Sequence, residues 1–202
     1  MPSPPPAALR RPTPAEIEAA RGGFVPDIIG PGLRALICGI NPSLYSAAVG
    51  HHFARPGNRF WPAIHAAGIT PRRLRPDEDG ELLALGYGVT NVVERATARA
   101  DELSPAELVA GGKRLAAKIA AYGPASVAVL GVSAYRAAFD RPRAAMGLQP
   151  ETLGGAPVWV LPNPSGLNAH YGLDALAAAY REFHAYAGSL AAPAGRAKRG
   201  RR

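Results

Sequence analysis

Short apolar runs rich in β-branched residues alternate along the chain with stretches in which apolar residues recur at helical spacing. The apolar runs predict buried strands at 34–40, 87–93, 126–130 and 157–161. The helical spacing predicts helices over 58–67, 81–85, 104–122, 133–139 and 173–187. Because strands that alternate with helices favour a parallel sheet covered on both faces, we expect an α/β fold.

The longest predicted helix carries signals at both of its ends. Ser104 takes the N-cap position, and Pro105 and Glu107 follow at the first and third helical positions. Serine caps a free backbone N–H, proline tolerates the first position, and the glutamate completes a capping box. A Gly-Pro pair at 123–124 then ends the helix.

Changes in composition divide the chain into three parts. Residues 1–32 are Pro-rich and are expected to be largely disordered, with one or two helical turns over 15–21. Residues 33–187 hold all the predicted strands, and this stretch is long enough for one domain with a real core. Residues 188–202 are rich in Ala, Gly, Pro and Arg and are expected to be a disordered basic tail.

The charge of the chain is large and unevenly placed. A formal net charge of +8 and a pI of about 10.1 favour an anionic partner such as nucleic acid. Five positive charges lie in the last seven residues: Arg196, Lys198, Arg199, Arg201 and Arg202. This basic end is either a solvated tail without a specific role or a source of salt-sensitive affinity for DNA.

Several classes of site are disfavoured. The single cysteine, Cys38, lies in an apolar run, so an internal disulfide and a thiolate-bound metal are excluded and a reducing cytoplasm fits. The adjacent His51 and His52 do not easily face one metal ion, so we expect no metal. No run approaches the ~20 apolar residues of a membrane span. The glycine motifs that bind nucleotide phosphates are absent.

Two turn segments follow predicted strands. The first is G-I-N-P at 39–42, and the second is N-P-S-G-L-N at 163–168. Pro, Gly and Asn in such turns do not continue a strand. In a parallel sheet the carboxyl ends of the strands form the edge where ligands bind, so the two segments predict a shared site.

The side chains near these turns allow more than one role. The amide of Asn41 can hold a water but cannot accept a proton as a base does, and Asn is also a common turn residue before proline. Phe53 can stack on a flat ligand or cap the core. Leu167 can wedge between base steps or anchor its loop. Glu94 is either a catalytic carboxylate or the partner of a basic neighbour.

Four motifs taken together are more specific than any one of them. G-I-N-P at 39–42, F-A-R-P-G-N-R-F-W at 53–61, V-T-N-V-V-E-R-A-T at 89–97 and N-P-S-G-L at 163–167 occur in this order. In this combination, residues 33–187 closely resemble the mismatch-specific uracil-DNA glycosylases, the branch that includes thymine-DNA glycosylase. The resemblance implies a three-layer α/β/α sandwich with a short, mainly parallel central sheet.

The resemblance also implies an activity and a partner. The family removes uracil, and also ethenocytosine, from G-paired duplex DNA by cutting the N-glycosidic bond, and it needs no metal or redox cofactor. The partner is then double-stranded DNA with a G·U or related mismatch. We expect a monomer that acts in the cytoplasm, at the nucleoid.

The family's functional residues carry over by position. Asn41 matches the asparagine that orients the attacking water, and Glu94 is a candidate to assist it. Phe53 matches the aromatic residue that stacks on the flipped base. Three further residues belong to the expected base-binding pocket: Ile40, Ser46 (on the C5 side of the pyrimidine) and Asn163. The segment that is expected to enter the duplex consists of Ser165, Gly166, Leu167, Asn168 and Ala169.

The chain departs from the family pattern at several positions. Ser43 stands where glycine is usual and Tyr45 where a small residue is common, so both are expected to narrow the pocket or alter its loop. Ala169-His170 stand where some members place an arginine. The segment 89–97 is closer to the thymine-DNA branch, which leaves the preference between uracil and thymine open. Two rival hypotheses also stay open: a uracil glycosylase that acts on single strands too, and a catalytically silent mismatch-binding module.

Overall fold

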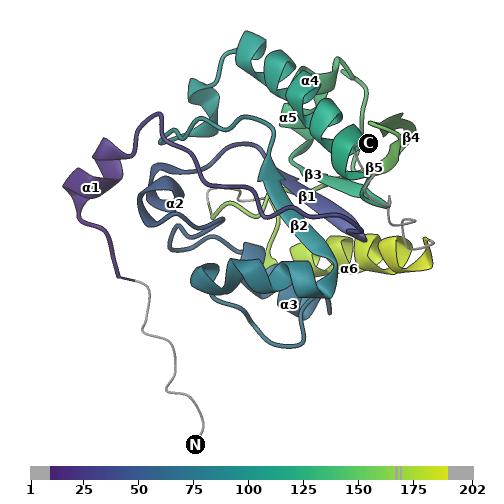
Figure 1. Cartoon of the computed structure of the whole chain (residues 1–202), viewed down its shortest axis with the longest axis horizontal. Helices are drawn as coiled ribbons and strands as arrows, with labels where there is room; N and C mark the ends of the chain where they lie inside the picture. The colour runs from purple at the N-terminus through teal and green to yellow at the C-terminus, as the bar shows by residue number, and fades with distance from the viewer. Residues whose placement is uncertain (1–9, 167, 169, 191–202) are drawn as a thin grey trace, which may run out of the picture.

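The computed structural model describes residues 10–166, 168 and 170–190, and its centre is a five-stranded sheet with the order β2-β1-β3-β5-β4 (Figure 1). Four strands run parallel: β1 (Ala35–Gly39), β2 (Tyr87–Asn91), β3 (Val127–Leu130) and β5 (Ala156–Leu161). β4 (Gly147–Leu153) pairs antiparallel with β5 at one edge. The sheet is therefore mainly parallel, as predicted.

Helices cover both faces of this sheet (Figure 1). On one face lie α4 (Pro105–Tyr122) and α5 (Val132–Phe139). On the other lie α3 (Phe60–Ala66) and α6 (Leu173–Ser189). The remaining helices are α1 (Pro14–Ala19), α2 (Leu44–Val49) and the 3-10 helices η1 (Pro76–Leu85) and η2 (Ala100–Glu102). The three-layer α/β/α sandwich expected from the sequence is confirmed.

The sheet separates two hydrophobic cores. Successive side chains of a strand point to opposite faces, so Ile37 packs with α3 and α6, whereas Leu36 and Cys38 pack with α4 and α5. Cys38 is fully buried, and this burial raises the pKa of its thiol. It serves as a small apolar core residue. None of the helices in the described ranges is long and apolar enough to cross a membrane.

Besides the short 3-10 helix η2, two elements of the structure were not predicted. The short helix α2 directly follows the first turn and is capped by Ser43, whose Oγ accepts a hydrogen bond from the N–H of Ser46 (3.1 Å). β4 contains Pro150 and a register shift between Leu148 and Thr152. Proline cannot donate to a ladder and is tolerated at a sheet edge. Because β4 contains polar residues and a proline, its sequence lacks the continuous apolar run by which the other strands were predicted.

The N-terminal segment also packs against the domain. Ile28 and Val89 exchange backbone hydrogen bonds of 2.9 and 2.8 Å, so this segment covers the free edge of β2. Val25 is buried. The packed part of the chain therefore begins before residue 33, and the boundary expected there falls inside it. Most of the basic tail, residues 191–202, lies outside the described residues.

Candidate active site

A cavity lies at the carboxyl edge of the sheet. Its walls come from parts of the segments 39–46, 52–58, 97–100 and 163–165, together with Asn91 at the end of β2. The structure thus brings both predicted turn segments to one cavity. Loops after parallel strands converge at this edge because all four parallel strands end there.

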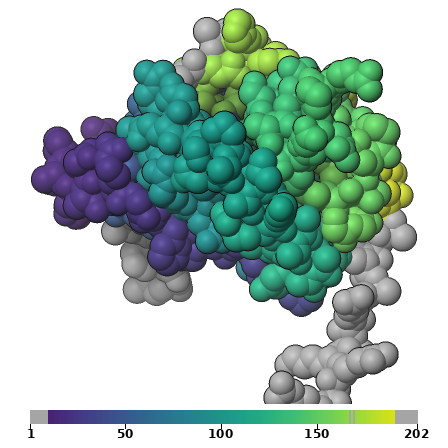
Figure 2. All heavy atoms as spheres, turned by 90° about the horizontal axis from the view of Figure 1, so that it is seen from above, coloured from purple at the N-terminus to yellow at the C-terminus, as the bar shows by residue number. Residues whose placement is uncertain are grey.

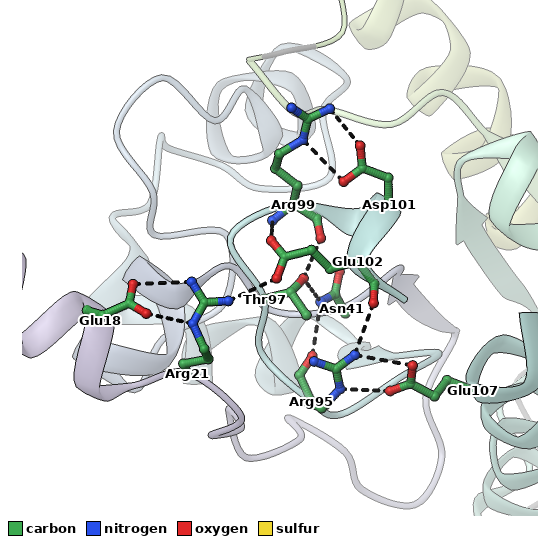
Figure 3. Close-up of polar contacts among 9 residues, drawn as sticks. All are labelled: Glu18, Arg21, Asn41, Arg95, Thr97, Arg99, Asp101, Glu102 and Glu107. Carbon is green, nitrogen blue, oxygen red and sulfur yellow. Dashed lines mark hydrogen bonds and ion pairs between the residues drawn. The ribbon is translucent and has the colours of Figure 1, made fainter. Parts of the chain in front are cut away.

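The amide of Asn41 is held in one orientation (Figure 3). Its Nδ2 donates to the backbone carbonyl of Arg95 (3.0 Å) and to Oγ1 of Thr97 (2.7 Å), and Thr97 Oγ1 in turn donates to the carbonyl of Arg99 (2.7 Å). A backbone carbonyl only accepts, which identifies the NH₂ end of the amide. Within the described ranges no group donates to Oδ1 of Asn41, so this oxygen keeps its capacity to accept hydrogen bonds.

Phe53 lines the cavity and also packs on the core. Its ring stacks on Phe60 with the centroids 3.9 Å apart and 22° between the planes. Its backbone is in the left-handed region with a φ of 54°, which costs a non-glycine residue free energy and is common at functional sites. The two roles that the sequence left open for Phe53 are therefore compatible in one position.

Asn91 is a cavity residue to which the sequence assigned no role. It is only 6% exposed, and its amide has no hydrogen-bond partner among the described residues. A Cβ added to Gly39 would lie 2.6 Å from Asn91 Oδ1 and 3.3 Å from Phe53 Cζ. Only glycine at position 39 leaves room for both side chains. The signal in the sequence was a polar residue at the end of a strand within the motif at 89–97.

Two residues that were predicted for the pocket in the first half of the chain also line the cavity. Ile40 and Ser46 both line it, and Ser46 Oγ accepts a hydrogen bond from the N–H of Ala54 (3.1 Å). Ser43 lines the cavity as well, and its role as the N-cap of α2 explains a serine at this position. Tyr45 does not line this cavity; it borders a separate surface hollow beside Ile17 of α1.

The second turn segment is fixed by an arginine that sequence reasoning missed. The guanidinium of Arg59 donates to the carbonyls of Ser165, Asn168 and Tyr171, with 2.8 Å to Asn168. The backbone N–H of Arg59 also donates to the carbonyl of Pro164 (3.0 Å). A planar guanidinium can bind several carbonyls at once, so Arg59 holds the backbone at Ser165, Asn168 and Tyr171 together.

The loop is also braced from within. Asn163 lines the cavity, and its Oδ1 accepts a hydrogen bond from the backbone N–H of Ser165 (3.0 Å). A Cβ on Gly166 would lie 2.7 Å from the carbonyl oxygen of Gly57, so the two loops touch at their glycines. Leu167 and Ala169, two of the residues expected to enter DNA, lie outside the described residues.

Glu94 is not brought to the cavity. Its side chain is 60% exposed, and its Oε1 lies 3.5 Å from Nζ of Lys118 on α4. Lys118 also binds the carboxylate of Asp27 and Oγ1 of Thr90 (3.1 Å). The expected catalytic contact with a water at Asn41 is therefore not supported by its position. The contacts correspond to the alternative role, an ion pair with a basic neighbour.

The two adjacent histidines face different partners. His52 is 2% exposed, and its Nε2 donates to the carbonyl of Pro26 (2.9 Å). Burial lowers the pKa of His52, which keeps its ring neutral. His51 Nδ1 lies 3.3 Å from a carboxylate oxygen of Asp79. In the described part of the chain, no three His, Cys, Asp or Glu residues are grouped so that they could hold a metal ion.

The family of this protein follows from its match to a family model, and a solved structure is similar as well. A solution NMR structure described as "a putative Uracil DNA glycosylase from Methanosarcina acetivorans" is similar at 20% sequence identity and a TM-score of 0.49, over 81% of this chain and 98% of that chain. The model of the uracil DNA glycosylase superfamily matches residues 26–184, a stretch that includes the whole sheet and the loops of the cavity. The protein therefore belongs to the uracil DNA glycosylase superfamily and is a DNA glycosylase, a hydrolase of N-glycosidic bonds.

Proposed function

We propose that this glycosylase removes uracil, and also ethenocytosine, from G-paired positions of double-stranded DNA and leaves an abasic site. The observation that carries the proposal is the fixed amide of Asn41, whose Nδ2 is held by two acceptors and which lines the same cavity as the aromatic ring of Phe53. An oxygen held in this way orients a water for attack on the sugar carbon. It does not remove the proton of that water in advance.

The cavity has groups suited to a pyrimidine. The exposed part of the Phe53 ring offers a surface for stacking, which contributes about 1–3 kcal/mol per base. The Asn91 amide carries both a donor and an acceptor, and it therefore complements the adjacent acceptor and donor on the edge of uracil. Its burial strengthens this recognition because an unmatched base would leave the amide unpaired.

A preference for mismatched bases does not require residues that recognise the mismatch directly. A base must leave the duplex before it enters the cavity, and this costs a few kcal/mol, less at a mismatch. We expect the segment 163–168 to take the space that the base leaves, and the hydrogen bonds from Arg59 to the carbonyls of Ser165 and Asn168 support this role. Position 41 carries an amide and not a carboxylate, so no general base removes the proton of the water and cleavage of the N-glycosidic bond is slow. Slow cleavage favours weakly paired bases, because these stay flipped out of the duplex for longer.

An alkali-cleavage panel tests the proposal. Excess protein is incubated with duplexes that contain uracil, thymine or ethenocytosine opposite guanine or adenine, and with uracil in a single strand. We expect cleavage of G·U and of ethenocytosine opposite guanine, slower cleavage of the adenine pairs, and most of the activity lost in Asn41→Ala. Undiminished cleavage by Asn41→Ala would contradict the assignment of the site.

The same panel separates the two rival hypotheses. Equal rates on single-stranded and mismatched uracil would indicate a broad uracil glycosylase. Tight binding of the G·U duplex without any strand cleavage would indicate a binding module. A protein that cuts the G·U duplex faster than the single strand fits the proposal alone.

A further inference from the structure

Both partners of the Asn41 amide belong to one loop. The carbonyl of Arg95 and the hydroxyl of Thr97 lie in the segment 95–102, which we term the anchor loop. At one end of the anchor loop, Arg95 pairs with Glu107 at the start of α4 (2.7 Å). The orientation of Asn41 therefore depends on what holds the rest of the anchor loop in place.

The backbone of the anchor loop is paired with the N-terminal segment. The N–H of Gly22 donates to the carbonyl of Ala96 (3.1 Å), and the N–H of Ala96 donates to the carbonyl of Gly23 (2.8 Å). Ala96 is fully buried and lies between the two residues that bind Asn41. Figure 2 shows the purple N-terminal segment packed against the teal middle part of the chain.

Side chains tie the far end of the anchor loop to the same segment (Figure 3). The guanidinium of Arg21 donates to Glu102 Oε2 (2.9 Å), and Glu102 Oε1 accepts from the backbone N–H of Arg99 (2.9 Å). Arg21 is itself oriented by two hydrogen bonds to Glu18 of α1, at 2.6 and 3.2 Å. The Glu102 carboxylate thus links α1 to the backbone of the anchor loop, two residues beyond Thr97.

We propose that the segment 14–23 is a clamp that positions Asn41 for catalysis, with Arg21 and Glu102 as positioning residues. The inference rests on the proposed function. The clamp lies outside residues 26–184, the stretch that matches the superfamily model. Neither Arg21 nor Glu102 lines the cavity, and they act on the reaction only through the anchor loop and the Asn41 amide.

Substitutions in the full-length chain test the clamp. Arg21→Ala and Glu102→Gln each remove the ion pair, which is partly exposed, and such pairs contribute up to about 1 kcal/mol. We expect the single-turnover rate on G·U DNA at saturating protein to fall about two- to fivefold. Glu102→Ala also leaves the N–H of Arg99 without its acceptor, so we expect a larger loss of about tenfold. Arg21→Lys should recover much of the rate.

Two further measurements separate positioning from other roles. The affinity for a G·U duplex with an uncleavable sugar should stay near that of the parent, and the midpoint of thermal unfolding should fall by only about 2–4 °C. In the Glu102→Ala background, Arg21→Ala should cause no further loss, because the two residues act through one contact. Arg10→Ala is the matched control: it breaks the exposed ion pair between Arg10, which precedes the clamp, and Glu16 within it, without touching the anchor loop, and it should react at the parent rate.

Three results would overturn the inference. Parent-like rates in both Arg21→Ala and Glu102→Ala would show that the clamp does not act on Asn41. A loss of DNA affinity that matches the loss of rate would make Arg21 a phosphate contact. An equal loss in Arg10→Ala would indicate a general effect of the segment. A parent protein that cuts none of the duplexes would instead refute the proposed function.

Discussion

Thr97→Val is the most direct test of how the site holds its asparagine. Thr97 is 1% exposed, and its Oγ1 accepts from Asn41 Nδ2 and donates to the carbonyl of Arg99, both at 2.7 Å. Valine keeps the branched shape of threonine and removes only the hydroxyl. The substitution therefore takes away one of the two anchors of the Asn41 amide and leaves the cavity wall in place.

The size of the effect follows from the hydrogen bonds that are lost. A hydrogen bond contributes about 0.5–1.5 kcal/mol net, and a buried group left unpaired costs about 1–3 kcal/mol. The amide N–H of Asn41 and the carbonyl of Arg99 both lose a partner, so we expect the protein to be destabilised by about 1–3 kcal/mol. The amide can then turn about its one remaining bond, to the carbonyl of Arg95. A loss of about 1–2 kcal/mol in the productive orientation lowers the rate about 5–30-fold.

The assay is single-turnover cleavage of a G·U duplex at saturating protein, with thermal unfolding measured in parallel. Thr97→Ser keeps the hydroxyl and should restore most of the rate. Thr70→Val is the matched control, because Thr70 is also buried but its hydroxyl has no partner in the described structure, so its loss should not lower the rate. If Thr97→Val cuts at the parent rate, the amide of Asn41 does not depend on this contact and the reasoning fails.

Three further predictions follow from the contacts of individual groups. Glu94→Gln should keep the single-turnover rate within about twofold, because the carboxylate pairs with Lys118 outside the cavity; a loss of the 10²–10⁴-fold that is typical of general-base removal would restore its catalytic role. Arg59→Lys should lower cleavage of duplex DNA at least about tenfold, because an ammonium group has its donors on a single nitrogen and does not reproduce the geometry by which two guanidinium nitrogens bind three carbonyls, and charged hydrogen bonds contribute about 1.5–3 kcal/mol each; cleavage of uracil in a single strand should change much less, and an equal loss on both substrates would contradict a role in the duplex-entering loop. Deleting residues 191–202 removes five cations and should flatten the salt dependence of DNA binding, by about 0.9 in the slope of log K against log salt for each lost phosphate contact; an unchanged slope would show that the tail makes no such contacts.

The local signals in the sequence located most of the framework. The apolar runs at 34–40, 87–93, 126–130 and 157–161 correspond to the four parallel strands, because a strand buried on both faces needs a continuous apolar run. Ser104 begins α4 and a glycine at 123 ends it, as the capping residues predicted. The edge strand β4 was missed because an edge tolerates proline and polar residues, so its pattern is weak.

The sequence predicted only those cavity residues that stand in turn motifs near the ends of strands. Asn41 and Phe53 stand in motifs next to strand ends, and both line the cavity. Asn91 also stands at the end of a strand. The pairing of β1 with β2 places Gly39 opposite Asn91, and only this pairing shows that a side chain at position 39 would collide with Asn91. A parallel pairing between distant segments is not encoded in the pattern of either one.

The sequence by itself determined the α/β fold, the order of its elements and the two turns that form the site, because burial and turn chemistry are local properties of a segment. Only the tertiary structure decided which polar groups meet. It paired Glu94 with Lys118 instead of Asn41, and it placed Arg59 under a loop more than 100 residues away in sequence. It also brought Arg21 to Glu102. A long charged side chain can reach in several directions, and the packing of the elements decides which partner lies within a hydrogen bond of it.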